Sequence, residues 1–309
     1  MTHGHGLTRR GFNGRVAALA AAAAVGPALL PRAARAQFAE EFTRTELAPG
    51  MHVITGRGGN ALVVAGEGGA VLIDTKVAGA GEDLRGLAET GGAPVAAVIN
   101  THHHADHTGG NPAFTGDLPV YAHENATPRV RAQFAGRGEN PEAFLPNRDA
   151  MEREELTVAG VTMRLAHPGP AHTDNDVHVF FPERNVLHTG DLVFHKLHPF
   201  IDRPAGATTA GWMAACRAML ERCDARTVVV PGHGEVTDRT GIERQIAYFE
   251  AAREAVGEVV AADGPKMAVS RIRLPIFEGM GFERLRVRAL EAIHDELTEE
   301  RRGAPAGAG

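Results

Sequence analysis

The stretch of sequence that decides the fold runs Asn100-Thr101-His102-His103-His104-Ala105-Asp106-His107-Thr108-Gly109-Gly110. It begins where the apolar segment 95–99, typical of a buried strand, comes to an end. The Gly-Gly pair that closes it predicts a tight turn. Four potential metal ligands therefore leave one strand end together, and this clustering predicts a metal site at that end.

The spacing within this stretch divides the ligands into two sets. A turn that leaves a strand can aim alternate side chains at one point, so His102 and His104 can share one metal ion. Asp106 and His107, at the start of the following turn, can reach a neighbouring ion. His103 points between its neighbours and is not expected to be a ligand. Imidazole and carboxylate groups are ligands that suit Zn²⁺ and also iron.

The pattern His-x-His-x-Asp-His resembles the hallmark of the metallo-β-lactamase superfamily, and the resemblance covers about residues 46–240. Three later segments match in the family's order: Gly169-Pro170-Ala171-His172-Thr173, His188-Thr189-Gly190-Asp191 and Pro231-Gly232-His233-Gly234. The resemblance implies an α/β fold, a four-layer αββα sandwich with its site at one edge of the two sheets and a helical extension at the C-terminus.

The resemblance also implies how the ligands are shared between two metal ions, with Zn²⁺ expected and iron or manganese as alternatives. The first ion would be held by His102, His104 and His172, and the second by Asp106, His107 and His233. Asp191 would bridge both.

Four further residues are candidates for roles around the metal ions. Asp74 occupies the position of a family aspartate that could orient a ligating imidazole, although capping a turn is an equal alternative. Asp176, shortly after His172, is a second candidate for such an orienting carboxylate. His195 and His198 follow Asp191 on a loop expected to border the cleft, so they are candidates for substrate contact.

The resemblance implies a metal-dependent hydrolase that acts on an ester, thioester, lactone or related bond of a small molecule. Two divalent ions roughly 3.5–4 Å apart lower the pKa of a shared water and polarise the scissile bond. Asp106 would hold the metal-bridging hydroxide in line and act as the catalytic carboxylate. The sequence contains no Gly-x-Ser-x-Gly motif, which fits a nucleophile that the protein chain does not supply.

Three other functions remain open. A β-lactamase of the commonest zinc type would resemble this chain but carries cysteine where Asp191 stands. A mononuclear-iron persulfide dioxygenase would use the equivalents of His102, His172 and Asp191 alone. A non-catalytic metal-binding partner in periplasmic sulfur or quinoprotein oxidation is suggested by the segments around Asp174 and Pro199-Phe200-Ile201-Asp202.

Short apolar runs and helical patterns alternate along the chain, as in a layered α/β domain. Strands are predicted at 51–54, 61–64, 70–74, 95–99, 155–158, 161–165, 177–181, 186–188 and 228–230, and helices at 79–91, 127–135, 208–223, 242–261 and 282–300. The predicted organisation is a domain at 37–240, C-terminal helices at 241–300 packed on it, and a disordered tail at 301–309.

The first 36 residues have the features of an export signal. Thr8-Arg9-Arg10-Gly11-Phe12 precedes an alanine-rich run at 16–30, and Ala34-Arg35-Ala36 resembles a signal-peptidase site. The paired arginines resemble a twin-arginine signal, which implies export of the folded protein to the periplasm by the Tat machinery. The run is too short and too interrupted to span a membrane, so no stable membrane anchor is expected after cleavage.

Composition limits the partners further. The formal net charge of −6 and the lack of clustered Lys and Arg in the mature chain argue against a nucleic-acid partner. Cys216 and Cys223 are seven residues apart in an expected helix, about 10 Å along its axis, and are too far apart for a disulfide. The sequence leaves the oligomeric state open.

Overall fold

The structure is a computed structural model that describes residues 42–303 except 90 and 151–154. The described residues from Thr43 onward form one compact unit. The predicted signal at 1–36 and the last six residues of the predicted tail lie outside the described residues. No helix in the described ranges has the length and apolar character needed to cross a membrane.

The first sheet has seven strands in the order β1-β2-β3-β4-β5-β6-β7. Strands β2, β3 and β4 form an antiparallel meander, and the pairs from β4 to β7 are parallel. Its strands are β1 (Phe42–Ala48), β2 (Met51–Gly56), β3 (Ala61–Gly66), β4 (Gly69–Ile73), β5 (Val95–Ile99), β6 (Val120–Ala122) and β7 (Arg148–Asp149).

The second sheet has five strands in the order β12-β11-β10-β9-β8. Its strands β8 to β11 are antiparallel neighbours, whereas β11 and β12 run parallel. The strands are β8 (Glu155–Val158), β9 (Val161–Ala166), β10 (His178–Phe181), β11 (Val186–Phe194) and β12 (Val228–His233).

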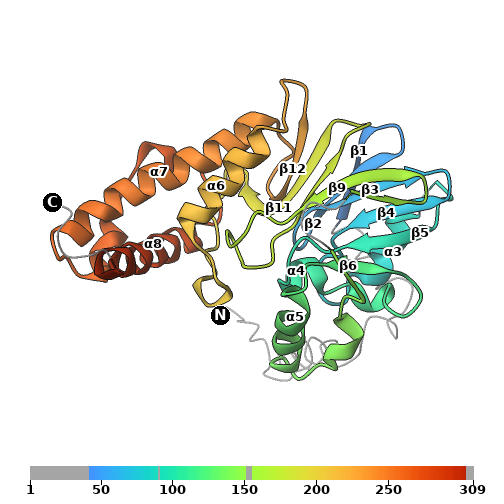
Figure 1. Ribbon diagram of the computed structural model, residues 1–309, viewed down its shortest axis with the longest axis horizontal. Helices are drawn as coiled ribbons and strands as arrows, with labels where there is room; N and C mark the ends of the chain where they lie inside the picture. Colours follow the sequence, from blue (N-terminus) through green and yellow to red (C-terminus); the bar gives the residue numbers. More distant parts are fainter. Residues whose placement is uncertain (1–41, 90, 151–154, 304–309) are drawn as a thin grey trace, which may run out of the picture. The chain divides into compact units, whose positions relative to one another are not determined.

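Helices cover the outer faces of both sheets, so the fold is a four-layer α/β sandwich (Figure 1). Helices α6, α7 and α8 lie together on one side, and α3, α4 and α5 lie on the other. The helices are α3 (Gly81–Ala88), α4 (Ala105–Thr108), α5 (Ala126–Ala135), α6 (Thr209–Leu220), α7 (Arg239–Ala261) and α8 (Glu283–Gly303), with short 3-10 turns at Asn111–Ala113, Pro141–Phe144, Arg203–Ala205, Lys266–Arg271 and Pro275–Phe277.

Two apolar cores hold the layers together. One core lies between the sheets and combines side chains of β2 to β5 with side chains of β9 to β12. The other joins β11 to α6, α7 and α8, and it includes the fully buried Trp212 and Phe249. Burial on this scale is the main favourable contribution to folding. Because α7 and α8 share this core with β11, the C-terminal helices pack on the sandwich.

The sheets bring four strand ends to one edge. Parallel strands end on the same side, so the residues after β4 and β5 lie together, as do those at the ends of β11 and β12. The loop between β9 and β10 ends on that edge too and carries His172. In open α/β sheets, ligands bind outside the carboxyl ends of the strands.

Several boundaries differ from the sequence-based expectations, and three of them concern the site or the C-terminal helices. Strand β11 continues to Phe194 rather than ending at His188, because parallel pairing with β12 resumes after an irregularity at Gly190. Helix α6 ends at Leu220, short of Cys223, and both cysteines are free. Helix α8 reaches Gly303, and its last turn is tied down by Arg301, whose guanidinium donates to Val260 O and Asp263 Oδ1.

Candidate metal centre

Three histidines and one aspartate form the first cluster of potential ligands. His102, His104, His172 and Asp191 each offer one ligand atom, and these atoms lie within 4.8 Å of one another. His102 Nε2 lies 3.0 Å from His104 Nδ1 and 3.7 Å from Asp191 Oδ2. His172 Nε2 also lies 3.7 Å from Asp191 Oδ2. The strand end after β5, the β9–β10 loop and β11 thus converge on one point.

The second cluster lies beside the first and consists of Asp106, His107 and His233. His233 Nε2 lies 3.2 Å from Asp106 Oδ2. Asp191 links the clusters, because its Oδ1 lies 3.1 Å from His107 Nε2 while its Oδ2 lies 3.5 Å from His233 Nε2. The structure therefore brings together all seven residues that the sequence singled out as ligands.

One carboxylate orients a histidine of each cluster. His107 Nδ1 donates to Asp74 Oδ2 at 2.7 Å. Thr101 Oγ1 donates to the same oxygen at 2.8 Å, so it accepts from His102 Nδ1 at 3.0 Å. Asp74 also accepts from the Thr101 backbone N–H at 2.8 Å. Both rings consequently turn an unprotonated Nε2 toward the site, which is the arrangement that metal-binding histidines need.

His172 and His104 are oriented in the same way by other carboxylates. His172 Nδ1 donates to Asp176 Oδ1 at 3.2 Å. His104 Nε2 donates to Asp202 Oδ2 at 2.9 Å, which leaves His104 Nδ1 as the atom facing the first cluster. Asp202 forms a further three-residue group with His104 and His103. Because His104 already faces His102, Asp202 is better understood as the residue that orients His104.

The charges of the potential ligands favour the binding of cations. Burial opposes ionisation of Asp191, yet the surrounding histidines, His233 first, hold the pKa of its carboxyl well below the ordinary value. Burial would lower the pKa of His233, but Asp191 and Asp106 raise it to about 9. His107 behaves alike, since carboxylates overcome burial and raise its pKa. Bound cations would satisfy these carboxylates and leave the imidazoles neutral.

Unsatisfied buried atoms show that the residues fit metal ions. His107 Nε2, His172 Nε2 and Asp191 Oδ1 are fully buried and have no hydrogen-bond partner. His102 Nε2 and His104 Nδ1 face each other at 3.0 Å although the opposite nitrogen of each ring already donates. Buried polar atoms are rarely left without a partner. Two cations, one per cluster, would fill these positions with ligands of the type that Zn²⁺ prefers.

Two glycines allow the backbone to approach the ligands closely. A Cβ on Gly59 would overlap the His107 ring, and a Cβ on Gly232 would overlap Asp191 Oδ1. Asn60, beside Gly59, donates from its side chain to Pro231 O at 2.9 Å and Gly234 O at 2.8 Å. The β2–β3 turn therefore supports the turn that carries His233.

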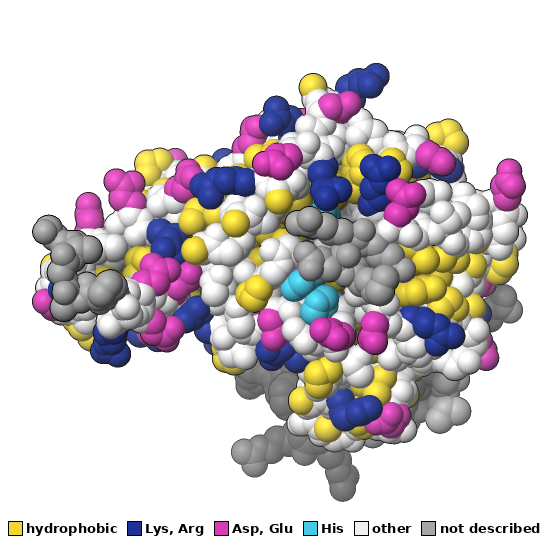
Figure 2. All heavy atoms as spheres, in the orientation of Figure 1, with side chains coloured by type: hydrophobic (Ala, Val, Ile, Leu, Met, Phe, Trp, Pro, Cys, Tyr) yellow, Lys and Arg dark blue, Asp and Glu magenta, His cyan; other side chains and the backbone are white. Residues whose placement is uncertain are grey.

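A pocket of about 560 Å³ opens over both clusters. The ligands His104, Asp106, Asp191 and His233 line it, together with His103, Asp202, Gln133, Arg137 and the apolar residues Val77, Ala105, Phe194, Phe200, Phe282 and Leu285. On the face drawn in Figure 2, histidine side chains reach the surface in one small area bordered by acidic side chains. A pocket of this size suits a small-molecule ligand.

Neither of the two histidines proposed for substrate contact lines this pocket. His195 Nδ1 donates to the backbone carbonyl of Glu235 at 2.9 Å. His198 is fully buried, 3.0 Å from Tyr248 Oη and 3.3 Å from Glu283 Oε2. The geometry lends their predicted substrate role no support.

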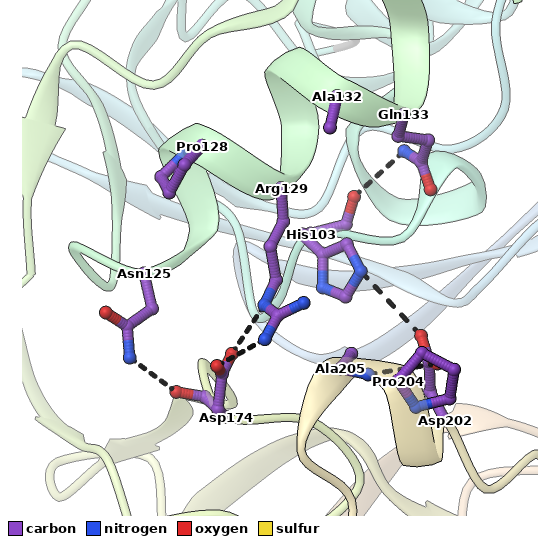
Figure 3. Close-up of a pocket in the computed structure, with 10 residues that line it drawn as sticks. All are labelled: His103, Asn125, Pro128, Arg129, Ala132, Gln133, Asp174, Asp202, Pro204 and Ala205. Atoms are coloured by element: carbon purple, nitrogen blue, oxygen red, sulfur yellow. Dashed lines mark hydrogen bonds and ion pairs between the residues drawn. The ribbon is translucent and has the colours of Figure 1, made fainter. Parts of the chain in front are cut away.

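A second cavity, of about 470 Å³, lies beside the first and shares His103, Gln133 and Asp202 with it (Figure 3). Arg129 from α5 enters this cavity and is held by Asp174 through Nε, at 2.7 Å. His103 forms part of the wall, and its Nδ1 accepts from Asn175 Nδ2 at 3.1 Å. His103 thus has a structural partner outside both clusters, as its position between two ligands led us to expect.

Sequence reasoning missed several residues around the site. Asp202 belongs to the segment Pro199-Phe200-Ile201-Asp202 noted in the sequence, but its contact with His104 was not predicted. Lys76 is fully buried, and its Nζ donates to Gly59 O at 2.6 Å. Burial lowers the pKa of Lys76 to about 7 despite the attraction of Asp74 and Asp106. An unusual backbone marks this segment, because both Asp74 and Lys76 have positive φ.

Comparison with known proteins agrees with this geometry. The chain is 30% identical over 142 residues to a metallo-beta-lactamase type 2 of Bacillus cereus, a match that covers 46% of this chain and 53% of the relative. It is 30% identical over 139 residues to a hydroxyacylglutathione hydrolase of Anaeromyxobacter dehalogenans (strain 2CP-C), covering 45% and 48% of the two chains. The chain thus spans about half the length of the curated relatives it matches.

Solved structures share the fold. A metallo-beta-lactamase from Pontibacter korlensis superposes with a TM-score of 0.59 at 24% identity, covering 68% of this chain and 99% of that one. The family model of the metallo-beta-lactamase superfamily matches residues 54–233, a span that contains both clusters. More than half of the sequence thus carries the family pattern, and the chain belongs to the metallo-β-lactamase superfamily.

Proposed function

We propose that the protein is a binuclear metal-dependent hydrolase that cleaves an ester, thioester or lactone bond in a small molecule. The observation that carries this proposal is the position of Asp191 between the clusters. Its Oδ1 lies 3.1 Å from His107 Nε2 of the second cluster, and its Oδ2 lies 3.7 Å from His172 Nε2 of the first and 3.5 Å from His233 Nε2 of the second. A carboxylate shared in this way is suited to hold two cations close together. Zinc is the cation that we expect in both positions, because the ligands are imidazoles and carboxylates.

Metal ions held at these clusters would supply a hydroxide nucleophile at neutral pH and polarise the scissile carbonyl. Asp106 would act on the attacking water. Its side chain is 35% exposed, whereas that of Asp191 is 4% exposed, so Asp106 is the carboxylate that reaches the open pocket. His107 and His233 overcome the effect of burial and hold the pKa of Asp106 well below its usual range, so the carboxylate stays ionised and can accept a hydrogen bond.

The relatives support acyl hydrolysis and name a second candidate reaction. The hydrolase of Anaeromyxobacter dehalogenans is described as acting on hydroxyacylglutathione, so a thioester is our first choice of substrate bond. The relative from Bacillus cereus is described as a metallo-β-lactamase, which makes a β-lactam amide the second candidate. Both bonds place a carbonyl carbon where a water oriented by Asp106 could attack.

The proposed function is tested by measuring metal content and turnover together. The chain from residue 37 onward would be purified with its metal, analysed for metal identity and stoichiometry, and assayed on thioesters, esters, lactones and a chromogenic β-lactam. Two zinc ions per chain and thioester or ester turnover are expected. Asp106→Ala should lower kcat by at least about a hundredfold, in the range seen for a positioned proton acceptor, while the circular dichroism spectrum is unchanged.

The matched control is Asp117→Ala, because Asp117 is an exposed carboxylate away from both clusters. It should keep full activity. One iron ion per chain, with oxygen uptake in the presence of a persulfide and no hydrolysis, would replace this proposal with the dioxygenase function. Full activity of Asp106→Ala would remove the role assigned to that residue.

A further inference from the structure

Two exposed aromatic rings stand in the pocket over the clusters. Within the described ranges, the exposed large apolar side chains are Phe200 at 38%, Phe282 at 44% and Met267 at 75%. Phe200 and Phe282 both line the pocket, and Met267 does not. Apolar surface left in water at a binding site commonly marks the part that a ligand covers.

The two rings lie beside different clusters. The Phe200 ring is 5.5 Å from the ring of His104, which belongs to the first cluster. The Phe282 ring is 5.6 Å from the ring of His233, which belongs to the second. A small molecule bound in this pocket over the two clusters would therefore lie beside both rings.

Phe282 is held in this position against a conformational cost. Its φ of 57° lies in the left-handed region, which a bulky side chain rarely adopts. Backbone hydrogen bonds fix the residue before it, since Gly281 N donates to Lys196 O at 2.9 Å and Gly281 O accepts from His198 N at 3.1 Å. Strain of this kind concentrates at functional sites. The loop after β11 thus positions the start of α8 at the pocket.

The character of the walls indicates what the rings bind. Val77, Phe194 and Leu285 extend the apolar surface beside them. Polar side chains line the pocket as well: Asp202 and Gln133 contact His103, and Arg137 is a further lining residue. The apolar part of the pocket borders both clusters, at Phe200 beside His104 and at Phe282 beside His233. Aromatic rings contact other rings favourably in edge-to-face and offset geometries, so an aryl group suits this region better than a charged one.

We propose that Phe200 and Phe282 form an aryl-binding subsite, which selects esters or thioesters that carry an aromatic ring next to the scissile bond. This inference rests on the proposed function, in which water adds across that bond to release a carboxylic acid and an alcohol or thiol. The subsite brings together residues from the loop after β11 and from the start of α8. It makes the C-terminal helix part of substrate recognition.

The test compares two thioesters that differ in the ring alone. Wild type, Phe200→Ala, Phe282→Ala and Phe282→Leu would be assayed on S-benzyl thioacetate and S-ethyl thioacetate. Each alanine variant should raise KM for the benzyl substrate about five- to tenfold, a loss of the size expected for one aromatic contact. The ratio of kcat/KM for the benzyl substrate to kcat/KM for the ethyl substrate should fall by a similar factor in each alanine variant. Phe282→Leu, apolar but without a ring, should fall between wild type and Phe282→Ala.

A second measurement does not depend on turnover. Binding of benzyl alcohol to the metal-loaded chains would be followed by saturation-transfer NMR, with Met267→Ala as the control for an exposed apolar side chain elsewhere. Wild type and Met267→Ala should bind, and both phenylalanine-to-alanine variants should bind at least about fivefold more weakly.

The two measurements separate the two proposals. Ring-dependent binding of benzyl alcohol without hydrolysis of any substrate would contradict the proposed function and leave the aryl subsite standing. The aryl subsite would be overturned if the variants hydrolysed both thioesters with equal losses of kcat/KM, or if neither variant changed KM or the binding of benzyl alcohol. The proposed hydrolase function would stand in either case. Phe200→Ala keeps the test valid if Phe282→Ala does not fold.

Discussion

At the scale of single residues, the site depends on carboxylates that are not themselves potential ligands of the first or second cluster. Asp74 orients one histidine of each cluster, directly at His107 and through Thr101 at His102. Asp176 and Asp202 do the same for His172 and His104. Each carboxylate decides which ring nitrogen carries the proton and which one is free to bind a cation. Loss of such a partner should therefore weaken metal binding without removing a ligand.

Asp202→Ala is the sharpest test of this role. The change removes the acceptor 2.9 Å from His104 Nε2, so His104 loses its fixed tautomer and orientation. We expect metal affinity to fall about 10- to 100-fold, the range seen when such outer partners are removed. The measurement is a metal titration against a competing chelator.

The control for Asp202 is Asp174→Asn, which lines the same side cavity but contacts Arg129 and no histidine of either cluster. Its metal affinity should match wild type. Equal affinities for wild type and Asp202→Ala would show that the hydrogen bond to His104 does not support metal binding.

At the scale of elements, helix α8 is joined to the start of α6 by one buried carboxylate. Glu296 is 4% exposed and accepts from the Thr209 backbone N–H at 2.9 Å and from Thr209 Oγ1 at 2.8 Å. Arg253 from α7 donates to the same side chain at 3.0 Å. The carboxylate satisfies backbone donors at the positive end of α6, where negative charge is favourable. Helices α6, α7 and α8 thus meet at the Glu296 carboxylate.

Glu296→Ala should lower the free energy of unfolding by about 1–3 kcal/mol, because it leaves the Thr209 donors without their buried acceptor, whereas Arg253 keeps its ion pair with Glu300. Glu296→Gln, which keeps one acceptor, should lose less. Urea unfolding followed by circular dichroism measures both.

Glu299→Ala on the same helix is the control. Glu299 is 66% exposed and pairs with Arg203 at the surface, so its loss should cost under about 1 kcal/mol. Equal losses of unfolding free energy for Glu296→Ala and Glu299→Ala would show that the buried contacts of Glu296 stabilise the protein no more than a surface ion pair does.

At the scale of the whole molecule, two buried histidines outside the clusters make stability depend on pH. Burial lowers the pKa of His178 from its ordinary value of 6.5 to about 4, and that of His188 likewise to about 4. The unfolded chain therefore takes up protons near pH 6.5, whereas the folded chain resists them until about pH 4. Stability must fall as the pH drops through this interval and must stop falling, for these groups, below it.

His178→Phe should remove the part of this pH dependence that comes from protonation of His178. The free energy of unfolding of wild type should fall relative to the variant by about 3 kcal/mol between pH 7.5 and pH 4, as the difference in pKa requires. Urea midpoints of the metal-free proteins at each pH measure the difference, because metal release would otherwise add its own pH dependence. His195→Phe, at a partly exposed position, should follow wild type. Identical pH profiles for wild type and His178→Phe would contradict the prediction.

The sequence by itself determined most of the elements and the ligand set. Strand β5 lies at the predicted residues, and α5, α7 and β8 differ by a few residues at most, because apolar periodicity and local turn signals depend on nearby residues. The short strands β6 and β7 were missed, because three- and two-residue segments carry too little pattern. The seven ligands could be named because a strand end and three turns each carry their own motif.

Only the tertiary structure decided what surrounds those ligands. The pairing of Asp202 with His104, of Asn60 with the turn before Gly234, and the approach of Phe282 to His233 join segments 98, 174 and 49 positions apart. No periodicity or local spacing marks such contacts, because they arise when separate layers pack. Local motifs therefore determine which residues can bind the metal ions. The orientation of those ligands and the apolar wall of the pocket depend on how the sheets and the C-terminal helices pack together.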